Sequence, residues 1–159
     1  MIESDNNISN KHLVFTVNSQ RYAMPVNIVE TVVRIVEIMP IPGAKDYIKG
    51  VINFHGDVIP VIDLRHKFTL PDRQIELTDQ LIIIQDSNRK FAVMVDGVLD
   101  VIQCDETNVS HIENEIADQA LLNGVAKVND GLILLNNFEY LFSSDEIKEI
   151  DQLVKQVEL

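Results

Sequence analysis

The amino-acid sequence repeats itself, and this repeat restricts the possible folds more than any other feature of the chain. Residues 13–32 (LVFTVNSQRYAMPVNIVETV) match residues 82–101 (IIIQDSNRKFAVMVDGVLDV) without a gap, at an offset of 69 positions. Residues 50–68 (GVINFHGDVIPVIDLRHKF) match residues 124–142 (GVAKVNDGLILLNNFEYLF) at an offset of 74. Two ordered matches at close offsets indicate an internal duplication. The chain should therefore contain two similar structural units.

Each half reads as a hairpin, a connecting segment and a second hairpin. Short runs rich in Val and Ile, separated by polar turns, are typical of small closed antiparallel sheets. We expect one barrel over residues 12–70 and a second over residues 79–142, with the polar stretch 71–78 (PDRQIELT) as the crossing between them. Residues 1–11 are polar and acidic, and we expect them to be disordered.

Helical signals are few. Ser143 and Glu146 have the spacing of a capping box. Apolar residues follow at helical spacing, namely Ile147, Ile150, Val154 and Val157. This pattern predicts a C-terminal helix over residues 143–157, packed outside the barrels. Asn27 and Glu30 could start a single helical turn earlier in the chain.

Charge and composition exclude several classes of protein. The 159 residues include 13 basic and 25 acidic side chains, giving a net charge of −12, which opposes binding to nucleic acid or to anionic lipid. No apolar run is long enough to insert directly into a membrane. A single cysteine rules out an internal disulfide and suits a reducing cytoplasm. We expect a cytoplasmic protein that is monomeric when isolated.

No pattern in the sequence supports a metal site, a cofactor or a catalytic nucleophile. The four histidines lack the close spacing of a metal motif; they are His12, His55, His66 and His111. Cys104 has no histidine near it in the sequence, so a buried or idle thiol is the favoured interpretation. We interpret Asp57 as a turn residue, and Asp63 and Asp96 as strand-end residues that accept hydrogen bonds from the backbone.

One segment has a more specific signature. YIKGVINFHGDVIPVIDLRHKF (residues 47–68) resembles the chemotaxis coupling-protein (CheW-like) family, whose members carry a pattern close to IKGVINLRG followed by PVIDLR. The opening segment HLVFTVNSQRYAMPVNIVETV, the later FAVMVDGVLDV and the closing GVAKVNDGLILLN are similar to further blocks of that family. The resemblance extends in order from His12 to Phe142.

The resemblance implies a fold and a role. It implies two five-stranded, SH3-like antiparallel barrels related by a pseudo-two-fold axis. It also implies a scaffold that couples the cytoplasmic tip of a methyl-accepting chemoreceptor to the regulatory domain of a CheA-type histidine kinase, which is itself built like this protein. The family implies no reaction and no cofactor.

The resemblance further places partner contacts in three regions: around Val29, in the 50–56 turn, and along residues 95–101. The candidate partner-binding residues are Val29, Thr31, Gly50, Asn53, His55, Gly56, Arg65, Val95, Asp96, Val98 and Val101.

Four positions depart from the family pattern. Thr31 stands where Glu is usual, Phe54 replaces Leu, His55 replaces Arg, and Asn137 stands where Asp is frequent. Near neutral pH an imidazole is mostly uncharged, whereas arginine always carries its charge. We therefore expect His55→Arg to tighten binding to a typical receptor tip.

Two other functions stay open at this point. The same module could act in a related pathway, or could compete for docking without coupling. An enzyme or a small-ligand barrel is disfavoured because the sequence shows no site chemistry. Receptor and kinase genes beside this gene would favour the coupling role, and turnover or a bound ligand would favour the last alternative.

Overall fold

The computed structural model describes residues 10–86, 89–105, 108–111, 122–129, 131–138 and 141–157. In chain order the elements are β1 (Lys11–Val17), β2 (Gln20–Pro25), the 3-10 turn η1 (Val26–Ile28), β3 (Val29–Arg34), β4 (Ile48–Phe54), β5 (Asp57–Asp63), α2 (Leu64–Lys67), β6 (Gln80–Asp86), β7 (Arg89–Val95), β8 (Gly97–Gln103), β9 (Val109–His111), β10 (Leu122–Val128), β11 (Gly131–Asn136) and α3 (Ser144–Val157). The expected mainly β fold, with two small SH3-like barrel sheets and a C-terminal helix, is confirmed.

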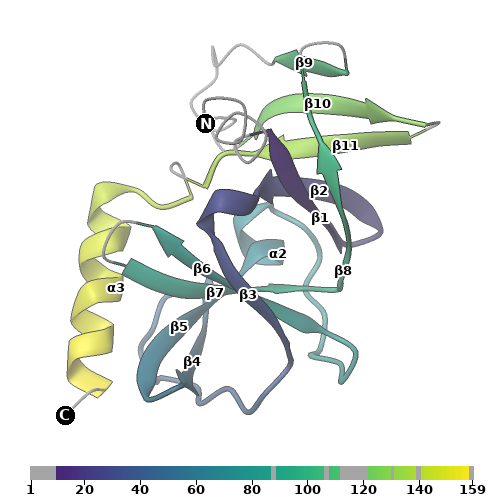
Figure 1. Ribbon diagram of the computed structural model, residues 1–159. Coiled ribbons are helices and arrows are strands. Elements are labelled where there is room, and N and C mark those ends of the chain that lie inside the picture. Colours follow the sequence, from purple (N-terminus) through teal and green to yellow (C-terminus); the bar gives the residue numbers. More distant parts are fainter. Residues whose placement is uncertain are drawn as a thin grey trace.

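The strands form two sheets, one on each side of a shared core (Figure 1). Sheet A has the order β8-β1-β2-β11-β10-β9, and sheet B has the order β3-β6-β7-β5-β4. Sheet B has the expected five strands, whereas the short strand β9 gives sheet A a sixth. Each sheet also contains one parallel pair, β2 with β11 and β5 with β7, so the expectation of purely antiparallel barrels is corrected.

The two sheets do not follow the two halves of the sequence. Sheet A combines the first hairpin of the first half with later strands of the second half, and sheet B does the reverse. The expected division into barrels at 12–70 and 79–142 is therefore wrong. The reason lies in the hairpins β1–β2 and β6–β7, which are buried on both faces. Each hairpin lies in the interior of its sheet. One face of the hairpin packs on the barrel interior and the other faces the second sheet, so both faces are covered.

The register of the strands establishes the pseudo-two-fold relation. Ala23 pairs with Leu135 in sheet A, and the equivalent Ala92 pairs with Val61 in sheet B. The outermost pairs also correspond, because β1–β8 and β6–β3 both contain a register shift at equivalent positions. The bulged residues are Leu99 in β8 and Glu30 in β3, which match at the offset of 69. The two duplicated halves of the sequence thus exchange strands, so that each of the two equivalent sheets contains strands from both halves.

Apolar side chains form one shared core and one interior for each sheet. The shared core draws Phe15 and Met24 from sheet A, and Ile62 and Ile84 from sheet B. The interior of sheet B is built from Ile52, Ile59, Val61, Leu81, Ile83, Ala92 and Met94. The interior of sheet A is built from Val14, Ala23, Cys104, Ala126, Ile133 and Leu135. Because the largest cluster belongs to both sheets, the two barrels should unfold together.

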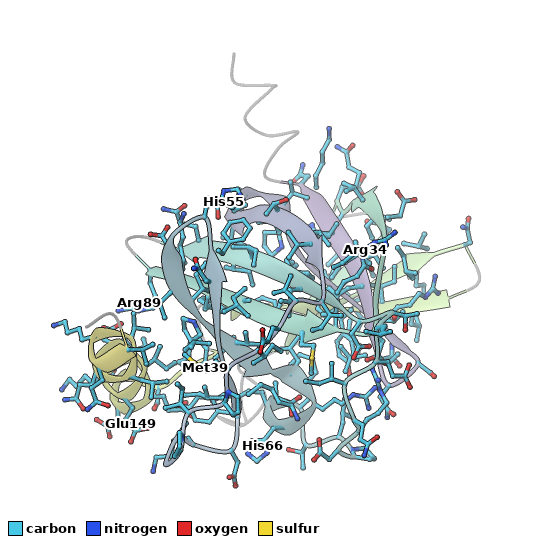
Figure 2. The ribbon with its side chains drawn as sticks, turned by 90° about the horizontal axis from the view of Figure 1, so that it is seen from below. Arg34, Met39, His55, His66, Arg89 and Glu149 are labelled. Atoms are coloured by element: carbon cyan, nitrogen blue, oxygen red, sulfur yellow. The ribbon has the colours of Figure 1, made fainter. Side chains whose placement is uncertain are left out.

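Helix α3 packs on the outside of sheet B, as expected. The capping box is formed: the Ser143 amide donates to Glu146 Oε1 at 2.9 Å, and the Glu146 amide donates to Ser143 Oγ at 3.2 Å. Glu146 also accepts a 2.6 Å hydrogen bond from Lys67 Nζ of α2. Ile150 is buried in the shared core. Figure 2 shows Arg89 beside this helix, where its guanidinium forms a two-pronged pair with Asp151.

The remaining expectations for loops and ends have mixed outcomes. Residues 71–76 contain neither helix nor strand, in agreement with a polar crossing. The single helical turn is present as η1, but it ends at Ile28, so Val29 and Thr31 lie in strand β3. The expectation of disorder over residues 1–11 falls mostly on residues 1–9, which lie outside the described residues. It is wrong for Lys11, which begins β1.

Candidate partner-binding surfaces

The structure separates the eleven candidate residues by their accessibility. Gly50, Arg65 and Val95 are buried. Asn53, His55, Gly56 and Val101 are exposed, and Val29, Thr31, Asp96 and Val98 are partly buried. A direct contact with a partner is therefore open to the second and third groups, while the buried group acts by shaping the fold.

Gly50 illustrates such an indirect role. It lies at the register shift between β4 and β5, and its φ of 149° is one that side chains disfavour. A Cβ at this position would collide with the carbonyl oxygen of Met39. The Met39 backbone forms a bridge to Val51 that covers the edge of β4. Glycine is needed here for the close approach of two chain segments.

The tip of the β4–β5 hairpin presents the exposed candidates together. His55 and Gly56 both have positive φ, 51° and 88°, as a tight two-residue hairpin turn requires. The side chain of Asn53 accepts a 3.1 Å hydrogen bond from the Gly56 amide. The His55 ring stacks on Phe54 with 4.2 Å between ring centroids. Figure 2 shows His55 at this tip, far from His66.

Strand β3 is linked to the same tip by Lys90 of β7. The Lys90 ammonium lies 3.0 Å from a carboxylate oxygen of Glu30 in β3 and 3.7 Å from one of Asp57 in β5. Both carboxylates raise the pKa of Lys90, and the hydrogen bond that Lys90 donates to Glu30 is the largest cause. Two of the three regions chosen from the sequence, around Val29 and at the hairpin tip, are thus neighbours in space.

The third region lies on strand β8, at the edge of sheet A. Val98 packs against the shared core, but Leu99 and Val101 leave 56% and 45% of their surface exposed. Sequence reasoning selected Val101 and missed Leu99. The signal for Leu99 was present in the repeat, because an apolar residue there corresponds to the charged Glu30 of the first half. Strand β8 therefore offers a partner two exposed apolar side chains, which lie on either side of Asp100 in the sequence.

Arg65 and Asp96 are brought together in an ionic network. Arg65 Nη2 and Arg73 Nη2 each donate a 2.7 Å hydrogen bond to the carboxylate of Asp96, which also accepts one from the Asn18 amide. Arg73 Nη2 is 2.7 Å from Asp79 as well. The network joins α2, the 71–79 segment and the β7–β8 corner.

The electrostatics of Asp96 reflect this environment. Partial burial acts to raise the pKa of Asp96, but the hydrogen bonds from Arg73, Arg65 and the Asn18 amide outweigh it and hold the pKa below its ordinary value. The interpretation of Asp96 and Asp63 as acceptors for backbone amides is confirmed, since Asp63 accepts from the Arg65 amide at 3.0 Å. The arginine partners of Asp96 were not found from the sequence because they are distant along the chain.

The described residues show little that could support catalysis. They contain no group of three or more His, Cys, Asp or Glu side chains able to hold a metal ion. Cys104 is buried in sheet A, and burial, followed by the charge of Asp105, raises the pKa of its thiol. A raised thiol pKa lowers the fraction of reactive thiolate. In the same part of the chain, no helix has the length and apolar character needed to span a membrane.

Comparison with known proteins gives a consistent result. Residues 11–146 match the family described as the CheW-like domain. The chain belongs to this family. Among solved structures, the scaffolding protein TtCheW from Thermoanaerobacter tengcongensis is 31% identical with a TM-score of 0.78, and the match covers 87% of this chain and 95% of that one.

Curated CheW-like proteins are similar over most of their length. The chemotaxis protein CheW of Klebsiella aerogenes is 26% identical over 150 residues, covering 93% of this chain and 90% of the relative. That of Bacillus subtilis is 37% identical over 99 residues, covering 62% of this chain and 64% of the relative. The expected family and fold are confirmed, and the CheW-like domain accounts for nearly all of the described residues.

Proposed function

We propose that this protein is a non-catalytic adaptor in bacterial chemotaxis that couples the cytoplasmic tip of a chemoreceptor to the regulatory domain of a CheA-type histidine kinase. The observation that carries the proposal is the match of 87% of the chain to a protein described as a scaffold, together with the CheW-like domain over residues 11–146. As such an adaptor it works in the cytoplasm and reaches the inner face of the membrane through the receptor.

Two exposed surfaces support the two contacts that an adaptor needs. The first, the β4–β5 tip surface, consists of Asn53, His55 and Gly56. The second, the β8 surface, consists of Leu99 and Val101. We assign the β8 surface to the kinase regulatory domain, because an apolar centre supplies most of the affinity in a modest protein interface. We assign the tip surface to the receptor, in keeping with the family position of His55.

The primary test is a pull-down of the native protein from its own cells, with identification of the proteins that come with it. The proposal expects a receptor and a kinase of the CheA type together. Recovery of a kinase without any receptor, or of neither, would contradict the coupling role. The recovered kinase and receptor then supply the regulatory domain and tip fragment for the binding measurements below.

Placing a charge on the β8 surface should weaken kinase binding. We expect Val101→Asp to reduce affinity for the regulatory domain by about tenfold or more, because a desolvated apolar contact is replaced by a carboxylate. The side chain is 45% exposed, so the melting temperature should stay nearly unchanged. Titration calorimetry and a thermal melt on the same sample measure both quantities.

Val36→Asp is the matched control, since Val36 is also a valine and 46% exposed but lies in the loop after β3, outside both proposed surfaces. It should bind the kinase domain like the wild type. If Val36→Asp and Val101→Asp lost affinity equally, β8 would have no special role.

Restoring the family's arginine at position 55 should strengthen receptor binding. We expect His55→Arg to bind a typical chemoreceptor tip roughly tenfold more tightly at pH 7.5, because a charge-assisted hydrogen bond contributes about 1.5–3 kcal/mol. His55→Asn tolerates the positive φ and lacks a charge, so it should show no such gain in affinity. Equal affinities for all three proteins would reduce His55 to a turn residue.

A further inference from the structure

The pseudo-two-fold relation exposes a difference in charge between the two sheets. In sheet B, Lys90 is neutralised by Glu30 of β3 and Asp57 of β5, at 3.0 and 3.7 Å. The repeat offsets of 69 and 74 place Arg21, Leu99 and Gly131 at the equivalent positions in sheet A. The cation is kept in the second sheet, but both carboxylates are replaced, one by an apolar side chain and one by hydrogen.

In sheet A these positions form what we call the Arg21 site: Arg21 of β2 lies against Gly131 of β11, and Leu99 of β8 lies on the other side of β1. The Arg21 guanidinium occupies the volume that a side chain on Gly131 would fill. Leu99 is the bulged residue of β8, as Glu30 is the bulged residue of β3, and it is 56% exposed. Among the described residues, no carboxylate forms an ion pair with Arg21, although the chain carries a net charge of −12.

The site therefore combines a cation that has no ion-pair partner among the described residues with an exposed apolar side chain. A guanidinium forms two parallel hydrogen bonds with a carboxylate, and its charge does not depend on pH in the physiological range. The group that complements it is an Asp or Glu side chain flanked by an apolar residue. The equivalent site in sheet B cannot take such a group, because Glu30 and Asp57 already occupy the position and would repel it.

We infer that Arg21 binds a carboxylate of the kinase regulatory domain, and that Leu99 packs against the apolar residue next to it. The inference rests on the proposed function, because it extends the β8 surface assigned to that domain. It also gives the adaptor a way to distinguish its two partners: the two equivalent sites differ in charge, and of the two only the Arg21 site attracts an acidic segment.

Removal of the cation tests the inference. We expect Arg21→Ala to weaken binding of the kinase regulatory domain by about tenfold or more, and Arg21→Glu to weaken it further. The loss should shrink at high salt, because Arg21 is only partly buried. Lys90→Ala is the matched control: it removes the equivalent cation of sheet B, which is already neutralised, and should change affinity less than twofold.

A second pair of variants supplies the missing carboxylate. Leu99→Glu recreates the arrangement of sheet B and should satisfy Arg21 internally, whereas Leu99→Gln removes the same apolar contact without adding charge. We expect Leu99→Glu to bind the kinase domain at least several-fold more weakly than Leu99→Gln. When Arg21 is also replaced by Ala, the difference in affinity between Leu99→Gln and Leu99→Glu should become smaller, because residue 99 then has no cation at position 21 to interact with.

The results separate failure of this inference from failure of the proposed function. If Val101→Asp loses kinase binding and Arg21→Ala does not, the β8 surface stands and the carboxylate contact is wrong. An equal loss in Lys90→Ala and Arg21→Ala would also overturn it, since the effect would then be general electrostatic attraction. A loss of affinity in Arg21→Ala for the chemoreceptor tip fragment alone would also overturn the inference. Thermal melts of each variant confirm that the compared proteins are folded.

Discussion

Ile62→Asp should leave the whole chain unfolded, in both barrels at once. Ile62 has no exposed surface and lies in β5, within the core that the two sheets share. Burying an unpaired carboxylate there costs several kcal/mol, and the side chain's own burial of about 1.5–3 kcal/mol is lost as well. A small domain is stable by only about 5–15 kcal/mol. Far-ultraviolet circular dichroism at 25 °C should show loss of the strand signal.

Ile62→Val is the conservative partner of this variant and should cost only about 0.5–1.5 kcal/mol. A single cooperative melt for Ile62→Val, reported equally by probes in sheet A and sheet B, would support the shared core. Two separated transitions, or an Ile62→Asp protein in which sheet A alone stays folded, would contradict it. Such a result would mean that each sheet is stabilised mainly by its own interior.

Asp96→Ala should be strongly destabilising for a change at a polar position. It removes the acceptor for the Arg65 and Arg73 guanidiniums, and the Arg65 side chain is only 9% exposed. Deleting one partner of a buried pair typically costs 3–5 kcal/mol, and because Asp96 itself is about a quarter exposed we expect about 2–4 kcal/mol. Urea unfolding measures this loss directly.

Asp151→Ala is the control for this experiment. It also removes the carboxylate of a two-pronged arginine pair, with Arg89, but Asp151 is 47% exposed. The free energy of unfolding should therefore fall by only about 0–1 kcal/mol in Asp151→Ala. If the two variants proved equally stable, the network around Asp96 would be no more than a surface ion pair.

The network around Asp96 should also make the stability of the protein depend on pH in the acidic range. The pKa of Asp96 is lower in the folded protein than its ordinary value of 3.8, so the unfolded chain takes up the proton more readily. The stabilisation is complete above about pH 4 and is lost as pH falls through the folded pKa. The wild type and Asp96→Ala should therefore converge in stability as pH falls below about 4, and an unchanged difference at pH 3 would argue against the network as its source.

Part of the candidate site could be read from the sequence. The hairpin turn at His55 and Gly56 follows from local chemistry, because a two-residue turn with positive φ favours such residues. The acceptor role of Asp63 and the capping box of Ser143 and Glu146 are also local. The burial of Arg65 was not readable, because its partner Asp96 lies 31 positions away. The family motif suggested that Arg65 contacts a partner, but in the structure this residue is buried.

Patterns in the sequence predict two equivalent units, their short strands rich in Val and Ile, and the C-terminal helix. Each of these depends on residues close together in the chain or on a repeat that can be counted. The pairing of the strands, in contrast, is known only from the folded protein. The hairpins β1–β2 and β6–β7 are buried on both faces, and each meets this need by entering the sheet completed by the other half. Several distant segments have similar local patterns, so the sequence alone does not show which of them pair. The exchange of strands, the shared core and the different charges of the two sheets follow from that pairing.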